Sequence, residues 1–572
     1  LDKRLEGAST ITQQVAKNFL LTNEVSLKRK IKEAILAFRI EKAYTKKRIL
    51  ELYLNEIYLG QGTYGVASAS LEYFNKSVKE LNYNESALLA ALPKAPSRYN
   101  PYKDISLAKI RRDLVLRNLK ENGYISNDEL KEFSNQKINL KKRKISLIKE
   151  ARSYTEEVRR IVNTDYGFKK LYSEGLSIST PLNGKYQIAA LNALRYGIES
   201  YDKRHGWRGP ITNIFKNQNW KNKIKNINLD KTLGWEIAEL INIDEYESDI
   251  KILSKEEKHK IIFKDLKWTR TKNFNELFEV GDLIFVKKNK KNNWILKQLP
   301  IVNGSIVVMN PHNGEIKALV GGYSFVSSEF NRATQAKRQP GSAFKPIVYA
   351  AALENGFLPN SIILDAPFVS KQGEGLKNWK PENYGKKFYG PSTLRKGIEK
   401  SRNLMTVRVA QHLGFEIISD ISKSLGVYKK VPELLSVSLG SNETTLLNLT
   451  NAYCTFINGG KKVSPTLITR IQDRRGKTIF NSEKRKCEGC KIIDTDQSSD
   501  FVPKIKDNYE QTISQETAYQ ITSMLEGAVK RGTGKKLKVL NVPLAGKTGT
   551  TNNNFDAWFI GSTSDLTIGV YI

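Results

Sequence analysis

The spacing of apolar residues changes twice along this chain, and this change requires several folded parts of different class. Up to about residue 120, apolar positions such as Ile11, Val15 and Phe19 recur every fourth residue, which is the period of a helix. Between about 210 and 300, short segments such as DIKIL and DLIFVKK alternate with polar turns and predict strands. The 572 residues suffice for three or four domains of roughly 150 residues each.

The first helices can be placed from caps and apolar stripes. Ser9 or Thr10 can cap a helix that begins with ITQQVAKNF, because a hydroxyl oxygen accepts from the free amides of a first turn. In the next helix, Ile31, Ile35 and Phe38 form one stripe, which predicts the buried face.

The pattern of apolar residues changes again near residue 302. GSIVVMNPHNGEIKALVGG predicts two strands joined by a Pro-His-Asn-Gly turn, helical segments follow, and strands return in DAWFIGSTSDLTIGVYI. A sheet built from both ends of a domain, with helices between, is an α+β layout. The stretch from about 106 to 170 is regular but poor in apolar residues, which predicts a charged connector. We therefore divide the chain into a helical part at 1–120, a helical linker at 121–209, a small barrel-like β part at 210–300 and an α+β part at 301–572.

The charge of the chain is strongly positive, with 93 Lys and Arg against 59 Asp and Glu and a formal net charge of +34. Such a charge favours acidic partners, but its sign alone does not choose among anionic lipids, acidic polymers and nucleic acid. The lysines form only short runs such as KKRK at 141–144, and no basic face carries interleaved aromatic residues. A solvated lysine-rich surface is therefore favoured, and no nucleic-acid partner is expected.

The two ends of the chain suggest a piece of a longer protein. No apolar run approaches the roughly 18 residues of a membrane-spanning helix, and the chain starts with the charged segment LDKRLEG. Because residue 1 is Leu and not Met, we expect the natural N-terminus, with any membrane anchor, to lie upstream. The strand-like run that stops at Ile572 suggests a trimmed C-terminus.

Cys487 and Cys490 form a Cys-x-x-Cys pair, which fits a surface-loop disulfide, two free thiols, a redox pair or half of a zinc site. Zinc needs two more ligands, and the four histidines are scattered singly through the chain. The disulfide or the free thiols are favoured, and no metal site is expected.

Ser342 and Lys345 stand three residues apart in RQPGSAFKP, so on a helix they share a face and the amine comes within hydrogen-bonding reach of the hydroxyl. Such a serine becomes a nucleophile only if it has a base, and lysine is a base only where burial or nearby positive charge lowers its pKa. Pro346 is tolerated only in a first helical turn, so the helix must begin very near Ser342. Alone, this spacing also occurs on many ordinary helix surfaces.

Two further motifs follow in order. KSRNLMTVRVAQHLG places Ser401 and Asn403 between helical stretches, and LAGKTGTTNNNFDAWF places the Lys-Thr-Gly run 547–549 in a strand before a polar turn. Gly546 and Gly549 would let the backbone of a substrate lie close alongside that strand.

The ordered triple of Ser-x-x-Lys, Ser-x-Asn and Lys-Thr-Gly resembles the signature of penicillin-binding proteins and serine β-lactamases. The chain is more than twice as long as a β-lactamase fold requires, while VSLGSNETTLLNLTNAYCTFINGG and VKRGTGKK resemble stretches that flank the motifs in class A synthases. The resemblance implies that Ser342 forms an acyl-enzyme with a D-alanyl-D-alanine stem peptide and that β-lactams react covalently there. It implies an oxyanion hole made by the amides of Ser342 and Thr550, and the following further roles: base for Lys345, proton relay for Ser401, amide binding for Asn403, and carboxylate binding for Lys547, Thr548 and Thr550, with Gly549 in the same strand.

The first part resembles the family-51 glycosyltransferase of class A penicillin-binding proteins, through GASTITQQ, RKIKE, ILELYLNEIYLGQGTYGVASAS and ALLAALPKAPSRYNP. The resemblance implies a lysozyme-like helical fold that polymerises lipid II. It makes Glu33 the second family carboxylate, suits Arg29 and Lys30 to the pyrophosphate, and lines the groove with Ser9, Thr10, Gln13, Gln14 and Lys17. Without the family match, an ordinary helix-surface ion pair explains Arg29 and Glu33 equally well. The family's first motif, with its principal glutamate, would precede residue 1, so we expect the full protein to polymerise glycan chains and this piece alone not to.

The segment 175–210 resembles the start of the transpeptidase unit in the 1A subfamily, where an OB-like insert follows and an antiparallel sheet flanked by helices carries the active site. The whole resemblance implies a bifunctional synthase anchored in the bacterial inner membrane, with its catalytic domains in the periplasm, acting on lipid II and nascent peptidoglycan. It implies no cofactor for transpeptidation and leaves a divalent cation open for glycosyl transfer. Two other hypotheses stand beside it: a serine DD-carboxypeptidase that uses water as acceptor, and a degenerate lysine-rich scaffold that binds cell-wall polymer without chemistry.

Overall fold

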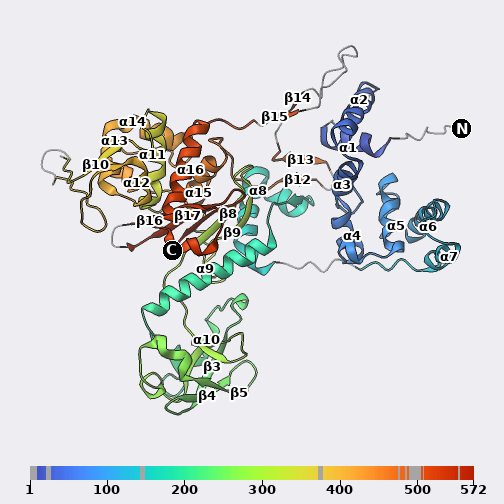
Figure 1. Ribbon diagram of the computed structural model, residues 1–572. Helices are drawn as coiled ribbons and strands as arrows, with labels where there is room; N and C mark the ends of the chain where they lie inside the picture. The colour runs from blue at the N-terminus through green and yellow to red at the C-terminus, as the bar shows by residue number, and fades with distance from the viewer. Residues whose placement is uncertain are drawn as a thin grey trace. The chain divides into compact units, whose positions relative to one another are not determined.

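The computed structural model describes residues 9–20, 27–141, 148–370, 378–473, 477–483, 486–488, 504–506, 508–551 and 554–572. Internal contacts divide the chain into two compact units. The first comprises Leu1–Leu147, Tyr172–Ser179 and Arg470–Asn508, and the second comprises Ile148–Leu171, Thr180–Thr469 and Tyr509–Ile572. Each unit is therefore assembled from segments that are distant in sequence (Figure 1).

The first unit is mainly helical. The predicted cap forms at Thr10, whose Oγ1 accepts the amide of Gln13 at 3.2 Å. Thr45 caps the third helix in the same way, with its Oγ1 accepting the amide of Arg48 at 3.3 Å. Its helices are α1 (Ile11–Leu20), α2 (Leu27–Ala43), α3 (Lys46–Glu56), α4 (Val66–Phe74), α5 (Tyr83–Ala91), α6 (Ile105–Glu121) and α7 (Asn127–Asn135).

The buried face of α2 is not the predicted one. Leu36 and Ile40 pack in the core with residues of α1 and α3, whereas Ile31 is 51% and Phe38 is 64% exposed. The prediction was wrong because two faces of α2 carry apolar residues at helical spacing. The face that becomes buried is the one that also carries Glu33, and periodicity does not say which face meets a neighbour.

Helices α6 and α7 differ from the predicted connector, because they pack onto the helical unit. Leu116 and Ile125 are buried together with a residue of α5. Arg112, which is fully buried, donates to Asn84 Oδ1 at 2.6 Å and to the carbonyl oxygen of Gln136 at 2.8 Å. A buried guanidinium makes contacts here that a hydrophobicity pattern does not detect.

Two small sheets complete the first unit with segments from far downstream. β1 (Ser177–Ser179), β12 (Arg470–Gln472) and β13 (Thr478–Asn481) form an antiparallel sheet, and β14 (Lys486–Glu488) pairs with β15 (Lys504–Lys506). Arg470 joins this sheet to the helices, since its Nη1 lies 3.3 Å from Glu56 Oε2 and its guanidinium lies over the ring of Tyr64.

The second unit is built on a five-stranded antiparallel sheet in the order β16-β17-β18-β8-β9. Two of its strands precede the helices that lie between residues 345 and 530, and three strands follow them, as the α+β prediction requires. Strand β16 lies at one edge, so one side of it is open within the sheet. The strands are β8 (Ser305–Met309), β9 (Ile316–Val320), β16 (Ala545–Thr550), β17 (Ala557–Ser562) and β18 (Thr567–Tyr571).

Helices cover both faces of this sheet. Along β8, Ile306 and Val308 pack against α9 (Gly184–Arg204). The residues of β8 that alternate with them therefore point to the opposite face of the sheet. That other face meets α15 (Leu446–Ile457) and α16 (Gln515–Lys530). Beside α16 lies a helical group, seen at the left of Figure 1, made of α11 (Lys345–Glu354), α12 (Leu394–Glu399), α13 (Asn403–Leu413) and α14 (Phe415–Ser424).

The predicted β part is a closed barrel. Its strands follow the order β2-β6-β3-β4-β5-β7, and an additional pairing of β6 with β7 closes the sheet on itself. The barrel-like prediction is confirmed. The strands are β2 (Thr212–Asn213), β3 (Glu236–Ile243), β4 (Glu247–Ile252), β5 (Glu257–Ile262), β6 (Asp282–Lys288) and β7 (Trp294–Lys297), and the remaining helices of the unit are α8 (Arg152–Ser173) and α10 (Trp220–Lys225).

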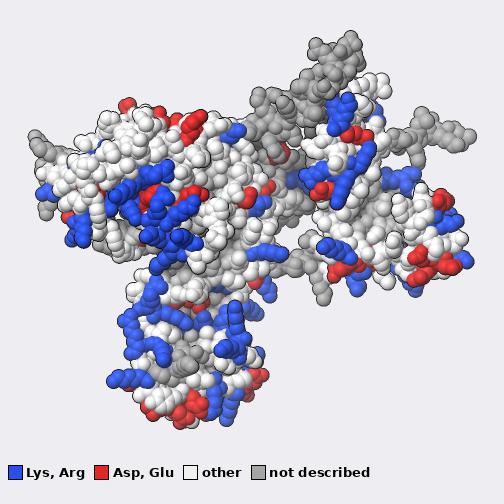
Figure 2. Space-filling view, viewed as in Figure 1, with Lys and Arg blue, Asp and Glu red and all other residues white. Residues whose placement is uncertain are grey.

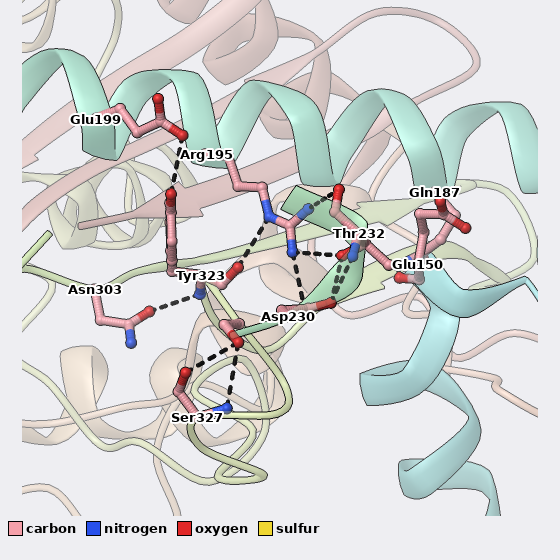
Figure 3. Close-up of polar contacts among 10 residues, drawn as sticks. Glu150, Gln187, Arg195, Glu199, Asp230, Thr232, Asn303, Tyr323 and Ser327 are labelled. Carbon is pink, nitrogen blue, oxygen red and sulfur yellow. Dashed lines mark hydrogen bonds and ion pairs between the residues drawn. The ribbon is translucent and has the colours of Figure 1, made fainter. Parts of the chain in front are cut away.

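A buried arginine on α9 ties the start of the barrel segment to the sheet (Figure 3). Arg195 donates to the carbonyl oxygen of Tyr323 at 3.0 Å and to Thr232 Oγ1 at 2.8 Å, and it lies 3.2 Å from Asp230 Oδ2. The hydroxyl of Tyr323 in turn donates to Glu199 Oε1 at 2.9 Å. One face of α9 therefore binds two segments that are about 90 residues apart in sequence.

Candidate active site

The three motifs of the C-terminal part converge beside the edge strand β16. A 3-10 turn at Gly341–Phe344 leads into α11, which begins at Lys345 with Pro346 in its first turn, as predicted. Ser401 lies between α12 and α13, and Asn403 is the first residue of α13. Lys547 lies within β16. Hydrogen bonds link Lys345 to the Ser-x-Asn motif, and link Ser401 of that motif to Lys547.

The amine of Lys345 is fully buried and faces the Ser-x-Asn motif. Its Nζ donates to Asn403 Oδ1 at 2.6 Å and to the carbonyl oxygen of Ser401 at 2.8 Å, and Ser401 Oγ lies 3.3 Å away. The Ser342 hydroxyl is half-buried and has no hydrogen-bond partner among the described residues. The sequence predicts the amine within hydrogen-bonding reach of that hydroxyl, whereas the structure turns it toward two stronger acceptors.

The second buried amine lies on the other side of Ser401. Lys547 Nζ donates to Ser401 Oγ at 2.8 Å and to the carbonyl oxygen of Thr548 at 2.9 Å. The Ser401 hydroxyl therefore lies between two lysines that come from different elements.

Burial changes the charge of both lysines. It lowers the pKa of Lys547 to about 7, because the low-dielectric interior disfavours an ammonium ion. Burial first, and the positive charge of Lys547 second, hold the pKa of Lys345 well below its ordinary value, while the carboxylate of Asp365 acts in the opposite direction. The lowered pKa that a lysine base needs is thus provided by the fold.

Ser401 adopts a left-handed backbone conformation, with φ of 55°. A residue with a side chain rarely occupies this region, at a cost of order 1–2 kcal/mol, and such strain clusters at functional sites. At this turn it brings the carbonyl oxygen and the hydroxyl of one residue to the same amine. No sequence signal indicated this conformation.

The two glycines of the Lys-Thr-Gly strand are closely packed against the chain's own atoms. A Cβ at Gly549 would lie 2.4 Å from the carbonyl oxygen of Pro340, and a Cβ at Gly546 would lie 2.7 Å from Phe559 Cζ. Both glycines make room for the chain's own backbone and side chains, and Gly549 lets β16 approach the turn that carries Ser342. That they also let the backbone of a substrate lie close stays a prediction.

The open edge of β16 presents free backbone groups. Ala557 pairs with Thr550, and both its N–H and its C=O bond to Ile572 on the other side. Because the backbone groups of Ala557 point to Ile572, Ala557 and Thr550 form a non-hydrogen-bonded pair of the antiparallel ladder. The N–H of Thr550 therefore points away from Ala557, to the open edge. This is the edge at which an extended peptide can add as a further strand.

Several residues near the motifs were not singled out by the sequence. The hydroxyl of Thr548 donates to Thr533 Oγ1 at 2.9 Å, and the amide of Thr533 donates to the carbonyl oxygen of Glu399 at 3.3 Å. Asp365 and Asn383 are buried next to Asn403. The stretch VKRGTGKK, which contains Thr533, is marked only by its resemblance to class A synthases, and no spacing or pattern marks the other three residues.

In the first unit, Glu33 gathers several predicted site residues. Its side chain is 1% exposed, and its oxygens lie 3.0 Å from Arg29 Nη1 and 2.7 Å from Lys30 Nζ. The hydroxyl of Ser9, which precedes α1, contacts Glu33 Oε1 at 3.4 Å and accepts from Lys30. An ordinary helix-surface ion pair does not describe this cluster, because the carboxylate is buried and a second element takes part.

The other residues predicted for the groove lie at the start of α1. Thr10 and Gln13 bond to each other's backbone amides, so part of their role is to cap the helix. Gln14 Nε2 donates to the carbonyl oxygen of Ser9 at 3.4 Å. Lys17 is half-buried one turn later and takes no part in these contacts.

Comparisons with known proteins agree with this arrangement along the whole chain. Family models described as Transglycosylase, Penicillin-binding protein OB-like domain and Penicillin binding protein transpeptidase domain match residues 1–120, 207–302 and 304–565. Penicillin-binding protein 1A of Rickettsia typhi is 45% identical over 575 residues, which cover 100% of this chain and 73% of that protein. The chain belongs to the class A penicillin-binding proteins, in the 1A family.

More distant members of the 1A family agree. Penicillin-binding protein 1A of Pseudomonas aeruginosa is 35% identical over 608 residues, covering 99% of this chain and 74% of that protein. The crystal structure of penicillin-binding protein 1A from Haemophilus influenzae has a TM-score of 0.65 at 32% identity and covers 96% of this chain and 84% of that chain. A class A penicillin-binding protein is a bifunctional peptidoglycan synthase with glycosyltransferase and DD-transpeptidase activity, of the class that β-lactams inhibit, and the predicted fold classes of its three parts are confirmed.

The described part of this class A protein shows neither a membrane-spanning helix nor a metal-binding cluster. No helix there is both long and apolar enough to span a bilayer. No group of three or more His, Cys, Asp and Glu side chains is placed to hold a metal ion, again among the described residues. Cys490 lies outside the described residues, as does the side chain of Cys487, so the question of their pairing does too.

Proposed function

We propose that the second unit crosslinks stem peptides through an acyl-enzyme on Ser342, and that the first unit supplies the lipid II polymerase of the full protein. The observation that carries the first part is the placement of two buried amines around Ser401, one following Ser342 by a single helical turn. Each named residue then has a chemical role that follows from its contacts.

Lys345 is the base in this proposal. A neutral amine has two hydrogens and one lone pair, and the two shortest contacts of Lys345, to Asn403 Oδ1 and the Ser401 carbonyl, take both hydrogens. The lone pair is then left to accept the Ser342 proton as its oxygen attacks the D-alanyl-D-alanine carbonyl. Such a base requires no cofactor.

Ser401 and Lys547 handle the leaving group and the terminal carboxylate. The Ser401 hydroxyl contacts both amines, so it can pass a proton from Lys345 to the departing amine of D-alanine. Lys547, with the hydroxyls of Thr548 and Thr550 on the same strand, attracts the carboxylate of the donor peptide.

The open edge of β16 positions the peptide. A donor that adds as a strand places its reacting carbonyl near the start of α11, where the amides of Ser342 and Thr550 form the oxyanion hole. The side chain of Asn403, already oriented by the surrounding loop, is available to the peptide amide.

Positive charge around this edge suits an acidic polymer. Figure 2 shows Lys and Arg side chains gathered over the region of α12 and β16. Stem peptides carry several carboxylates, and a field of one sign raises the local concentration of a ligand of the other sign. The exposed cations contributed by α12, α16 and the turn that follows are Lys396, Lys400, Lys530, Arg531, Lys535, Lys536 and Lys538.

For the first unit, we propose that Glu33, held by Arg29 and Lys30, lies in the lipid II site, with Ser9, Gln14 and Lys17 nearby. A membrane anchor in the full protein and a periplasmic location for both units go with a lipid-linked substrate. A divalent cation does not fit the described residues, since the oxygens of Glu33 are occupied by cationic side chains and the described residues hold no metal-binding group.

Covalent labelling by a fluorescent penicillin tests the acyl-enzyme. We expect a stoichiometric adduct on the native chain and none on Ser342→Ala, while Ser564→Ala, which alters an exposed serine in the turn between β17 and β18, labels normally. Absence of labelling on the native chain would support the scaffold hypothesis instead. Incubation with a D-alanyl-D-alanine peptide and an amine acceptor separates crosslinking, which gives the coupled product, from the carboxypeptidase hypothesis, which gives only hydrolysis.

A further inference from the structure

A buried carboxylate and a buried amide lie behind the Ser-x-Asn turn, outside the three motifs. Asp365, at the end of β10 (Ile362–Asp365), is 0% exposed, and Asn383, in the loop that leads to β11 (Gly390–Thr393), is 5% exposed. A carboxylate taken fully out of water is costly unless its charge is used or compensated. The contacts of this pair indicate its use.

Asn383 is held in one orientation. Its Nδ2 donates to Asp365 Oδ1 at 2.8 Å and to the carbonyl oxygen of Lys387 at 2.9 Å. A carbonyl, like an ionised carboxylate, can only accept, so the amide cannot be flipped without losing both bonds. Asn383 Oδ1 therefore faces the first turn of α13, where it accepts the amides of Asn403 at 2.8 Å and Leu404 at 3.4 Å.

The neighbouring residue orients the side chain of Asn403. Asn403 Nδ2 donates to the carbonyl oxygen of Glu382 at 2.6 Å, which turns Asn403 Oδ1 toward Lys345 Nζ, also at 2.6 Å. Two consecutive loop residues thus hold both the backbone and the side chain of Asn403. The oxygen that receives a hydrogen of Lys345 is placed by this loop.

The second oxygen of Asp365 carries charge without a hydrogen bond. Asp365 Oδ2 is buried and has no hydrogen-bond partner among the described residues. Arg402 Nε lies 3.8 Å away, and the Arg402 guanidinium is stacked on the ring of Tyr389. Three charged groups therefore act on the Lys345 amine: Lys547 from β16, Arg402 from the turn before α13, and Asp365 from β10. Asp365 is the anion among them.

We infer that Asp365 and Asn383 are positioning residues for acyl transfer, Asn383 by fixing Asn403 against the Lys345 amine and Asp365 by orienting Asn383 and supplying a counter-charge to Lys345. The inference rests on the proposed role of Lys345 as the base for Ser342. Neither residue touches the reacting atoms.

The variant Asp365→Asn separates charge from shape. The new amide oxygen can still accept from Asn383 Nδ2, while the negative charge is gone. Lys345 acts as a base only above its pKa, so the acylation rate rises with pH as the lysine loses its proton. Loss of a nearby anion lowers the pKa of Lys345 and therefore moves this rise, the acid limb of the pH–rate profile, to lower pH. We expect a shift of about one pH unit with a fluorescent penicillin, together with a lower plateau.

Two variants of Asn383 test orientation. Asn383→Ala removes the acceptor for the α13 amides. We expect the maximal rate to fall about 10- to 100-fold, as for loss of a partner that orients a functional residue, without a shift in the pH at which the rate rises. Asn383→Asp can still accept both amides and, when protonated, donate to Asp365, so we expect partial recovery. Gly385→Ala, which adds a methyl group in open space in the same loop, is the matched control and should label at the native rate.

The outcomes are distinct. Native acylation rates with a native pH dependence in both Asp365→Asn and Asn383→Ala would overturn the inference. A second pattern would also overturn it: a lower rate in Asp365→Asn with an unchanged pH dependence, together with no recovery in Asn383→Asp. That pattern is expected from a loss of folding alone. If Asp365→Asn does not fold, the comparison of the Asn383 variants decides by itself. Persistence of the adduct in Ser342→Ala would instead defeat the proposed function.

Discussion

Lys547 Nζ donates to Ser401 Oγ at 2.8 Å, and the same hydroxyl lies 3.3 Å from Lys345 Nζ. One side chain thus connects two buried amines whose positive charges repel each other. Because water is excluded from both, the protonation of one lysine affects that of the other. The chemistry of the site therefore depends on pH in a way that can be measured.

Acylation by a penicillin should lose rate in alkaline solution. Burial lowers the pKa of Lys547 to about 7, so in the free enzyme its positive charge is present below pH 7 and disappears above it. A penicillin carries a carboxylate that this charge attracts. We expect the second-order rate constant to fall above pH 7, approaching tenfold per pH unit, in labelling measured from pH 5 to 10.

The methyl ester of the same penicillin is the control for that prediction. It lacks the carboxylate, so its rate constant should not fall over the same range. A rate constant for the free acid that keeps rising to pH 10 would contradict the assigned role of Lys547.

Gly549→Ala should impair the site through the backbone. The new Cβ would lie 2.4 Å from the carbonyl oxygen of Pro340 and 2.9 Å from Ala343 Cβ, so β16 must move away from the turn that carries Ser342. We expect a loss of about 1–3 kcal/mol in stability, seen as a lower thermal midpoint, and at least a tenfold slower acylation.

Gly197→Ala is the matched methyl addition. This glycine lies inside α9, and its Cβ would meet Ile572 Cδ1 at an ordinary 3.6 Å. Alanine favours a helix over glycine by about 0.5–1 kcal/mol, so this variant should be as stable as the native chain or more so. Equal behaviour of the two variants would refute the packing argument for Gly549.

Arg195→Met should destabilise the second unit. The substitution removes the donors to Tyr323 and Thr232 and leaves Asp230, which is buried, without its cation. Removal of one partner from a buried ion pair costs about 3–5 kcal/mol, which urea unfolding can detect. Arg204→Met alters an exposed arginine of the same helix and should stay within about 0.5 kcal/mol of the native chain. A loss at Arg195 no larger than the loss at Arg204 would show that the buried contacts contribute little.

Local sequence was a good guide where the determinant is local. The cap at Thr10, the hairpin of β8 and β9 and the helix start at Ser342 and Pro346 depend on neighbouring residues, and all were predicted. The buried face of α2 and the packing of α6 were not, because they depend on which distant element covers a helix.

The sequence by itself determined the reactive groups and their order: a serine and lysine one turn apart, a Ser-x-Asn turn and a Lys-Thr-Gly strand. Only the tertiary structure decided what these groups can do. The charge on both lysines follows from burial, and the charge on Lys345 follows also from Lys547, while the direction of the Asn403 side chain follows from a loop residue 21 positions away. Dielectric environment and hydrogen-bond direction are properties of the assembled site, since segments far apart in sequence create them together.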